Sequence, residues 1–214
     1  MSTATAPHRS VVTTRAGALG LTLVVAGLVG CASAVVVLVW PHQVSDRRYS
    51  YPFDATWYAV AQLVFAVQHL GLVAGLVGLT GIAWSRSRGA TRVGLVLTTA
   101  GLVLLTGCEV FALSASDALV GSARANTVDG SYGVPMTVIG GGMLVAGAGL
   151  ARRPVLPGAG RWGLLALGVY LFVVMFPAVF GPMVAGRVAI GVWMLMFAGL
   201  GLGLMRSDGE VGAP

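Results

Sequence analysis

Three ionisable side chains lie inside long apolar stretches of this sequence, namely His69, Glu109 and Arg187. An ionisable group at membrane depth is costly, so it marks a functional site by default. A carboxyl group and an imidazole together can bind a proton and pass it on, which would make Glu109 and His69 a proton or ion relay. The alternatives are a structural, hydrogen-bonded carboxyl group and a satisfied core histidine.

Glu109 and His69 are expected to meet at similar depth. Each lies near the middle of its apolar stretch, and a short connection makes the two stretches antiparallel neighbours. We therefore predict that the two side chains come within reach of one another, directly or through one water. Both lie on polar helix faces, which also contain Thr99, Thr106 and Ser116 beside Glu109, and Tyr58, Gln62 and Phe65 beside His69.

Arg187 lies about one and a half turns inside the last apolar stretch. A planar guanidinium can bridge carboxylates at different depths. We predict that it pairs with Asp117 or Glu109, and Asp117 is favoured because it lies nearer the surface. Tyr170 offers one more hydroxyl near the middle of the fifth stretch. The candidate intramembrane polar cluster consists of His69, Glu109, Asp117, Tyr170 and Arg187.

The composition requires a membrane setting for these residues. The chain has 214 residues, of which 57% are hydrophobic and only 9% are charged, against about 25% charged in a soluble domain. A water-soluble fold of this size could not bury so much apolar surface. Soluble enzymes, nucleic-acid binders and disordered tails are therefore excluded. All 13 basic residues are arginines, so lysine Schiff-base chemistry is excluded as well.

The apolar stretches predict an all-α bundle of six transmembrane helices in a single membrane domain over 1–214, since each span needs about 20 apolar residues. The fourth span is expected to begin at Pro135, which suits a first helical turn. Residues 120–133 would then form a loop. The predicted spans are 16–40, 57–84, 93–119, 134–150, 162–180 and 182–205, with cytoplasmic tails 1–15 and 206–214.

Arginine placement predicts the orientation, because cytoplasmic loops carry an excess of basic residues. Nine arginines fall on the side of the two termini and four on the other. We therefore expect both termini inside, in a multi-pass protein of the bacterial plasma membrane. The nine are Arg9, Arg15, Arg86, Arg88, Arg92, Arg152, Arg153, Arg161 and Arg206, and the four are Arg47, Arg48, Arg124 and Arg187.

No cofactor or metal is expected. The sequence contains no CxxC pair and no HExxH motif, and His69 is the only histidine at membrane depth, which leaves a bis-histidine haem without its second ligand. Leu28 to Cys31 fits a lipoprotein signal box. The apolar stretch continues past Cys31 to Trp40, however, which favours an ordinary first span.

Small residues at helical spacing form two faces that let helix backbones approach closely in lipid. They pack within the chain or form a surface for a homo-oligomer or a membrane partner, and packing within the chain is favoured. The expected partners are thus the lipid bilayer and a homo-oligomer or membrane partner that would use these faces, and nucleic acid is excluded. The faces are Gly71, Gly75 and Gly78, and Gly142, Ala146 and Gly149.

Two parts of the chain resemble a family of small six-helix integral membrane proteins from high-GC Gram-positive bacteria. The first part runs from Trp40 through Tyr49–Phe53 to Val67–Gly71, and the second from Val179 through Arg187 to Trp193. The resemblance implies a location and a topology, but no activity. The leading hypothesis is therefore a non-enzymatic membrane protein that acts through its polar cluster or through partner contacts. A small-solute or proton-coupled transporter using Glu109 and His69, and a membrane-embedded enzyme or redox subunit, are the alternatives.

Overall fold

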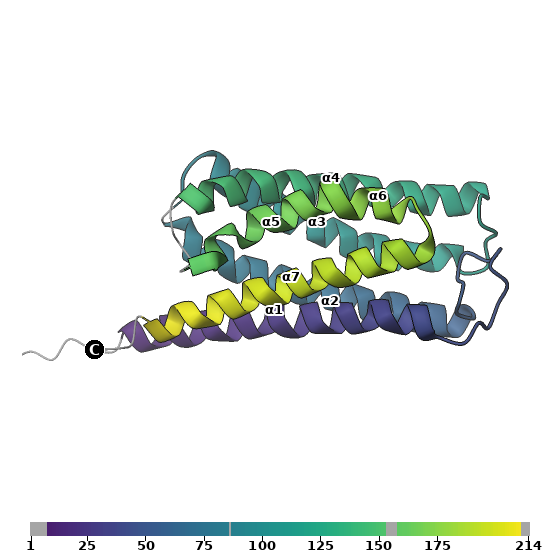
Figure 1. Ribbon diagram of the computed structural model, residues 1–214, viewed down its shortest axis with the longest axis horizontal. Coiled ribbons are helices and arrows are strands. Elements are labelled where there is room, and N and C mark those ends of the chain that lie inside the picture. Colours follow the sequence, from purple (N-terminus) through teal and green to yellow (C-terminus); the bar gives the residue numbers. More distant parts are fainter. Residues whose placement is uncertain (1–7, 86, 153–157, 211–214) are drawn as a thin grey trace, which may run out of the picture.

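The chain folds into a bundle of six long apolar helices, each long enough to cross a membrane (Figure 1). The computed structural model describes residues 8–85, 87–152 and 158–210, and this part of the chain contains no β-strand. The fold is therefore the expected all-α, six-span bundle. The helices are α1 (His8–Val39), α2 (Ala55–Trp84), α3 (Ala90–Ala112), α4 (Ala123–Arg152), α5 (Gly163–Tyr170), α6 (Phe176–Val179) and α7 (Met183–Glu210). The two short helices α5 and α6 belong to one span, the fifth.

The six spans form a closed ring of neighbours. Helix α1 packs against α2 and α7, α3 packs against α2 and α4, and α5 packs against α4 and α7. The start of α1 and the end of α7 lie at the same end of the bundle, which we call the termini end (Figure 1). The opposite end, here the loop end, holds the connections 40–54, 116–122 and 180–182.

Glycines allow the helix backbones to touch. A Cβ atom on Gly27 of α1 would lie 2.5 Å from the carbonyl oxygen of Met194 on α7. The two glycine faces identified in the sequence are also used within the chain. The face beginning at Gly71 packs against α1, and the face beginning at Gly142 packs against α3. Both faces are therefore covered within the chain and are not free to bind a second copy. A homo-oligomer stays a prediction, and it would need another surface.

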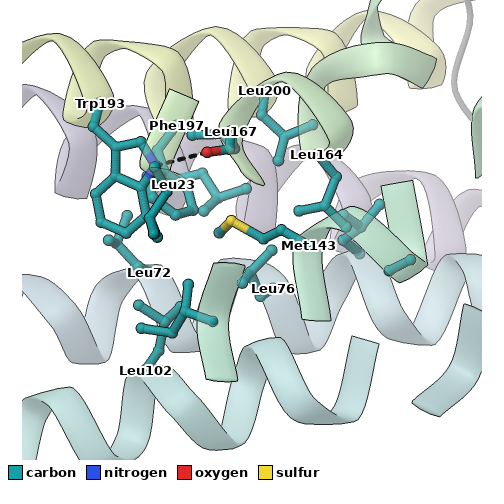
Figure 2. Packing of buried hydrophobic residues seen from close by; sticks show 14 of the residues in the cluster. Leu23, Leu72, Leu76, Leu102, Met143, Leu164, Leu167, Trp193, Phe197 and Leu200 are labelled. Atoms are coloured by element: carbon teal, nitrogen blue, oxygen red, sulfur yellow. Dashed lines mark hydrogen bonds between the residues drawn. The ribbon is translucent and has the colours of Figure 1, made fainter. Parts of the chain in front are cut away.

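A dry core fills the bundle from its middle toward the termini end. Leucines from all the spans meet there around Met143, Trp193 and Phe197, and most of them have no exposed surface (Figure 2). Trp193 and Phe197 stack edge to face, with ring centroids 4.8 Å apart. The indole N–H of Trp193 donates to the carbonyl oxygen of Leu167 at 3.2 Å, so this core contains no unsatisfied indole group.

The fourth span differs from the prediction. Helix α4 begins at Ala123, where Ser122 Oγ accepts the backbone N–H of Ala125 at 3.3 Å, so the predicted start at 134 and the loop 120–133 are wrong. Pro135 lies inside the helix and offers no N–H to the carbonyl of Ser131. The Cys108 thiol on α3 donates to that carbonyl at 3.4 Å instead, which satisfies the freed group.

The third and fifth spans also depart from simple helices. Helix α3 ends at Ala112 and continues as one 3-10 turn over Leu113–Ala115, short of the predicted end at 119. The fifth span joins α5 to α6 through a π-helical turn, Leu171–Met175. Pro177 follows this turn at once, and a proline cannot donate the backbone hydrogen bond of a regular helix. The π turn widens the span where that bond is lost.

Candidate functional site

The predicted encounter of His69 and Glu109 is present in the structure. His69 Nδ1 on α2 lies 3.6 Å from Glu109 Oε1 on α3. The side chains are buried, with 6% of His69 and 7% of Glu109 exposed. The hydroxyl of Tyr132 on α4 donates to the other carboxyl oxygen, Glu109 Oε2, at 3.0 Å. Three helices therefore converge on one buried carboxyl group.

Pro135 and Cys108 position this convergence. Cys108 precedes Glu109 on α3, and Ser131 precedes Tyr132 on α4, so the bond from Cys108 to Ser131 lies next to the bond from Tyr132 to Glu109. The carbonyl that Pro135 frees thus provides a second link between the same two turns of helix. The α3–α4 contact is fixed at the depth of the carboxyl group.

Two separate hydrogen-bonded pairs lie between the level of Glu109 and the loop end. Gln62 Nε2 donates to the hydroxyl of Tyr58 at 2.7 Å, and that hydroxyl donates to the carbonyl oxygen of Ala112 at 3.4 Å. The ring of Tyr49, from the connection 40–54, stands edge-on to Tyr58 with centroids 6.4 Å apart. Its hydroxyl donates to Asp129 Oδ1 at 2.7 Å. Asp129 is exposed, so this second pair lies at the surface.

Tyr49 is kept neutral by its surroundings. Burial, and next the hydrogen bond and charge of Asp129, raise its pKa well above the usual tyrosine value. Backbone bonds hold it in place. The Tyr49 N–H donates to the carbonyl of Ala118 at 3.0 Å, and the Val120 N–H donates to the carbonyl of Arg47 at 2.9 Å. The connections 40–54 and 116–122 therefore form one cover over the loop end.

Arg187 on α7 points into the bundle but does not make the predicted ion pair. Its guanidinium carbon lies 6.0 Å from the ring centroid of Phe65 on α2. The charge of Glu109 acts on this guanidinium over a distance longer than an ion pair. No carboxylate lies within ion-pair distance of it in the described residues, and no hydrogen bond to its side chain is present there.

Asp117 is not part of the cluster, so its predicted contact with Arg187 is wrong. It lies beyond the end of α3 in the exposed connection 116–122, where its carboxylate oxygen is 3.1 Å from Arg124 Nη1. The prediction placed it on a helix that ends at Ala112. Tyr170 also has another role, since its hydroxyl donates to the carbonyl oxygen of Ala189 at 3.1 Å and links α5 to α7.

The site is therefore the loop-end cluster of Tyr58, Gln62, His69, Glu109, Tyr132 and Arg187. On the side of the termini end it borders the dry core, where Leu72, Leu76 and Leu102 have at most 1% of their surface exposed. The polar cluster thus ends at His69. Within the described residues no three His, Cys, Asp or Glu side chains converge as a metal site would require.

Tyr132, Tyr49 and Asp129 were not among the predicted site residues. Tyr132 and Asp129 fell in the segment expected to be a loop, and Tyr49 lies in a connection with no helical periodicity. The sequence contained one usable signal, since Ser122 is a preferred helix N-cap residue that precedes the start of α4.

No protein-family model, curated protein or solved structure matches this chain. The chemistry of the cluster is therefore the basis for any functional conclusion.

Proposed function

We propose that this is a non-enzymatic integral membrane protein in which Glu109 and His69 exchange a proton with the loop end. One observation carries the proposal, namely the buried contact of Glu109 with His69 and Tyr132. Ionisable groups at this depth are expensive, and they are retained where proton or ion binding uses them. The hydrogen-bonded pairs Gln62–Tyr58 and Tyr49–Asp129 lie between this level and the exposed loop end and support a proton path in that direction, whereas the apolar core opposes passage onward.

Infrared difference spectra test this directly. The full chain in lipid nanodiscs is stepped between about pH 5 and pH 9, and the carboxyl C=O stretch is followed. We expect a band from one carboxyl group in apolar surroundings that disappears in Glu109→Gln. Asp117→Asn is the control, because it removes an exposed carboxylate of the same end. Identical bands in wild type and Glu109→Gln would contradict the proposal.

Proton-coupled transport of a small solute is the second candidate. The π turn before Pro177 favours it, because such turns are frequent at functional sites and interrupt an otherwise rigid span. Transport would require the dry core to open toward the termini end. Proteoliposomes containing a pH-sensitive dye check this with a panel of amino acids and short carboxylic acids. A solute-dependent proton flux that Glu109→Gln abolishes would favour the carrier over a site that only binds a proton.

The remaining predictions complete the proposal. We infer a bacterial plasma membrane location with both termini inside, in line with the resemblance to membrane proteins of high-GC Gram-positive bacteria. The nine arginines of the termini end against four at the loop end support this orientation. Cysteine-accessibility labelling checks it. Cysteine introduced at Ser45 should react with an external reagent, and cysteine introduced at Ser85, which is exposed at the other end of the bundle, should not.

A further inference from the structure

Arg187 has donors that nothing in the described chain uses. A guanidinium offers five N–H groups, yet within the described residues no hydrogen bond or ion pair reaches this side chain, whose guanidinium carbon lies 6.0 Å from the centroid of the Phe65 ring. It lies about 6 Å along α7 from the first helical residue, Met183, at 1.5 Å per residue. The side chain is half-buried, and a charge inside a span is expensive unless something pairs with it.

Two further atoms of the loop-end cluster are unpartnered. Gln62 Oε1 and His69 Nδ1 are buried and have no hydrogen-bond partner. The great majority of buried polar atoms in folded proteins have a hydrogen-bond partner. Gln62 donates to Tyr58, and the guanidinium carbon of Arg187 lies 6.0 Å from the ring centroid of Phe65, which is on the same helix as Gln62. The unpartnered groups thus belong to one cluster, and they come from two facing helices, α2 and α7.

The tyrosine hydroxyls of the cluster are not free to bind a ligand by donation. Tyr58 donates to Ala112, and Tyr132 donates to Glu109. The imidazole N–H of His69 and the guanidinium of Arg187 are the unused donors of the cluster, and only the guanidinium is forked and permanently cationic. This geometry matches the paired oxygens of a carboxylate or a phosphate. Gln62 Oε1 can accept a hydrogen from a protonated oxygen of the same group.

We propose that Arg187 binds an oxyanion, the phosphate or carboxylate group of a small solute or of a lipid headgroup, within the loop-end cluster. The inference deepens the proposed function, because it names the ligand class of the same site. It rests on the proposed function only because both use the same cluster of residues. Binding of an oxyanion requires Arg187, whereas proton exchange requires Glu109, so each can fail without the other.

The experiment measures thermal stability of the full chain in dodecyl maltoside micelles, which contain no phosphate. In one arm inorganic phosphate or acetate is added, with sodium chloride at equal ionic strength as reference. In the other arm no free phosphate is added, and phosphatidylglycerol is added to the micelles. The variants are Arg187→Gln and, as matched control, Arg47→Gln, which removes an exposed arginine at the same end.

We expect at least one probe to raise the Tm of wild type by on the order of 2–4 °C, as a ligand that binds only the folded state does. Arg47→Gln should keep this rise and Arg187→Gln should lose it. A rise with phosphate or acetate assigns a free solute, and a rise with phosphatidylglycerol alone assigns a lipid headgroup.

Two results overturn the inference. One is no rise in wild type with any of the three probes, and the other is an equal rise in wild type and Arg187→Gln. If Arg187→Gln does not fold, Arg187→Lys replaces it, since it keeps the charge but loses the fork and should weaken binding on the order of tenfold. Glu109→Gln should retain the rise, which separates failure of this inference from failure of the proton site.

Discussion

The two ends of the bundle differ in the side chains that fill the space between the helices. Toward the termini end, apolar side chains around Trp193 and Met143 interlock and exclude water. Toward the loop end, the same helices present hydroxyl, carboxyl, amide and guanidinium groups to one another. Ionisable groups within a membrane span are costly, whereas apolar side chains are not. This difference between the two ends is the physical basis on which we propose a functional site at the loop end.

The largest effect should come from glycines that hold the dry half together. A Cβ atom on Gly142 would lie 2.7 Å from the backbone nitrogen of Thr98 and 2.8 Å from the carbonyl oxygen of Gly94. Gly142→Val should therefore reduce the free energy of unfolding by about 3 kcal/mol. The adjacent Gly141→Val is the control, because no atom lies within 4 Å of a Cβ at that position. Equal effects of the two variants in a denaturation assay would refute tight α3–α4 packing.

The next effect concerns the carboxyl group of the loop-end half. Glu109→Leu leaves Tyr132 without an acceptor and should cost about 2 kcal/mol of unfolding free energy. Glu109→Gln keeps an acceptor oxygen, so its cost should stay below about 1 kcal/mol. Chemical denaturation of the two variants measures the difference. If Glu109→Leu were as stable as wild type, the hydrogen bond from Tyr132 to Glu109 would contribute nothing to stability.

A third prediction isolates the link beside the cluster. Cys108→Val removes the donor to the Ser131 carbonyl and should cost about 1 kcal/mol. In the Pro135→Ala background a backbone N–H becomes available for that carbonyl, so the same cysteine substitution should cost almost nothing. A double-mutant cycle in unfolding experiments gives the coupling. Additive effects would show that the thiol and the proline do not share the carbonyl.

The pH dependence of Tyr49 gives a smaller effect. Because its folded-state pKa lies above the usual value of 10.0, its stabilising contribution is complete below about pH 10 and is lost as the pH rises further. Asp129→Asn should lower the pKa of Tyr49, so this variant should lose less stability above pH 10 than wild type does. The free energy of unfolding of wild type and of Asp129→Asn is measured against pH, with Asp117→Asn as control. A steeper alkaline loss in Asp129→Asn would argue against the hydrogen bond.

The smallest effect is an expected absence of coupling. Arg187→Leu and Asp117→Asn should be additive to within about 0.5 kcal/mol, because the two side chains do not share a contact. Arg124→Leu and Asp117→Asn should instead couple by about 0.2–1 kcal/mol, as an exposed ion pair does. A larger coupling in the first cycle than in the second would restore the ion pair that the sequence predicted.

The sequence was sufficient for the six spans and for the meeting of His69 and Glu109, because hydropathy and helical periodicity depend on single segments and their order. It was insufficient where one helix changes the behaviour of another. Pro135 was interpreted as a helix start because its lost hydrogen bond is normally tolerated there. The thiol of Cys108, from a different span, donates to the carbonyl that the interior proline leaves free. Tyr132 was missed for the same reason, since it lies within the segment that this interpretation made a loop.

The contact between α1 and α7 has a consequence for synthesis. A chain emerging from the ribosome places α1 in the membrane first and α7 last, yet these two helices are neighbours whose backbones touch at Gly27. Until α7 is inserted, the surface of α1 around Gly27 has no helix to pack against. It is covered only when this last span is in place. The ring of helices therefore closes only after every preceding span has been inserted, and a chain stalled before α7 would expose this surface to membrane proteases.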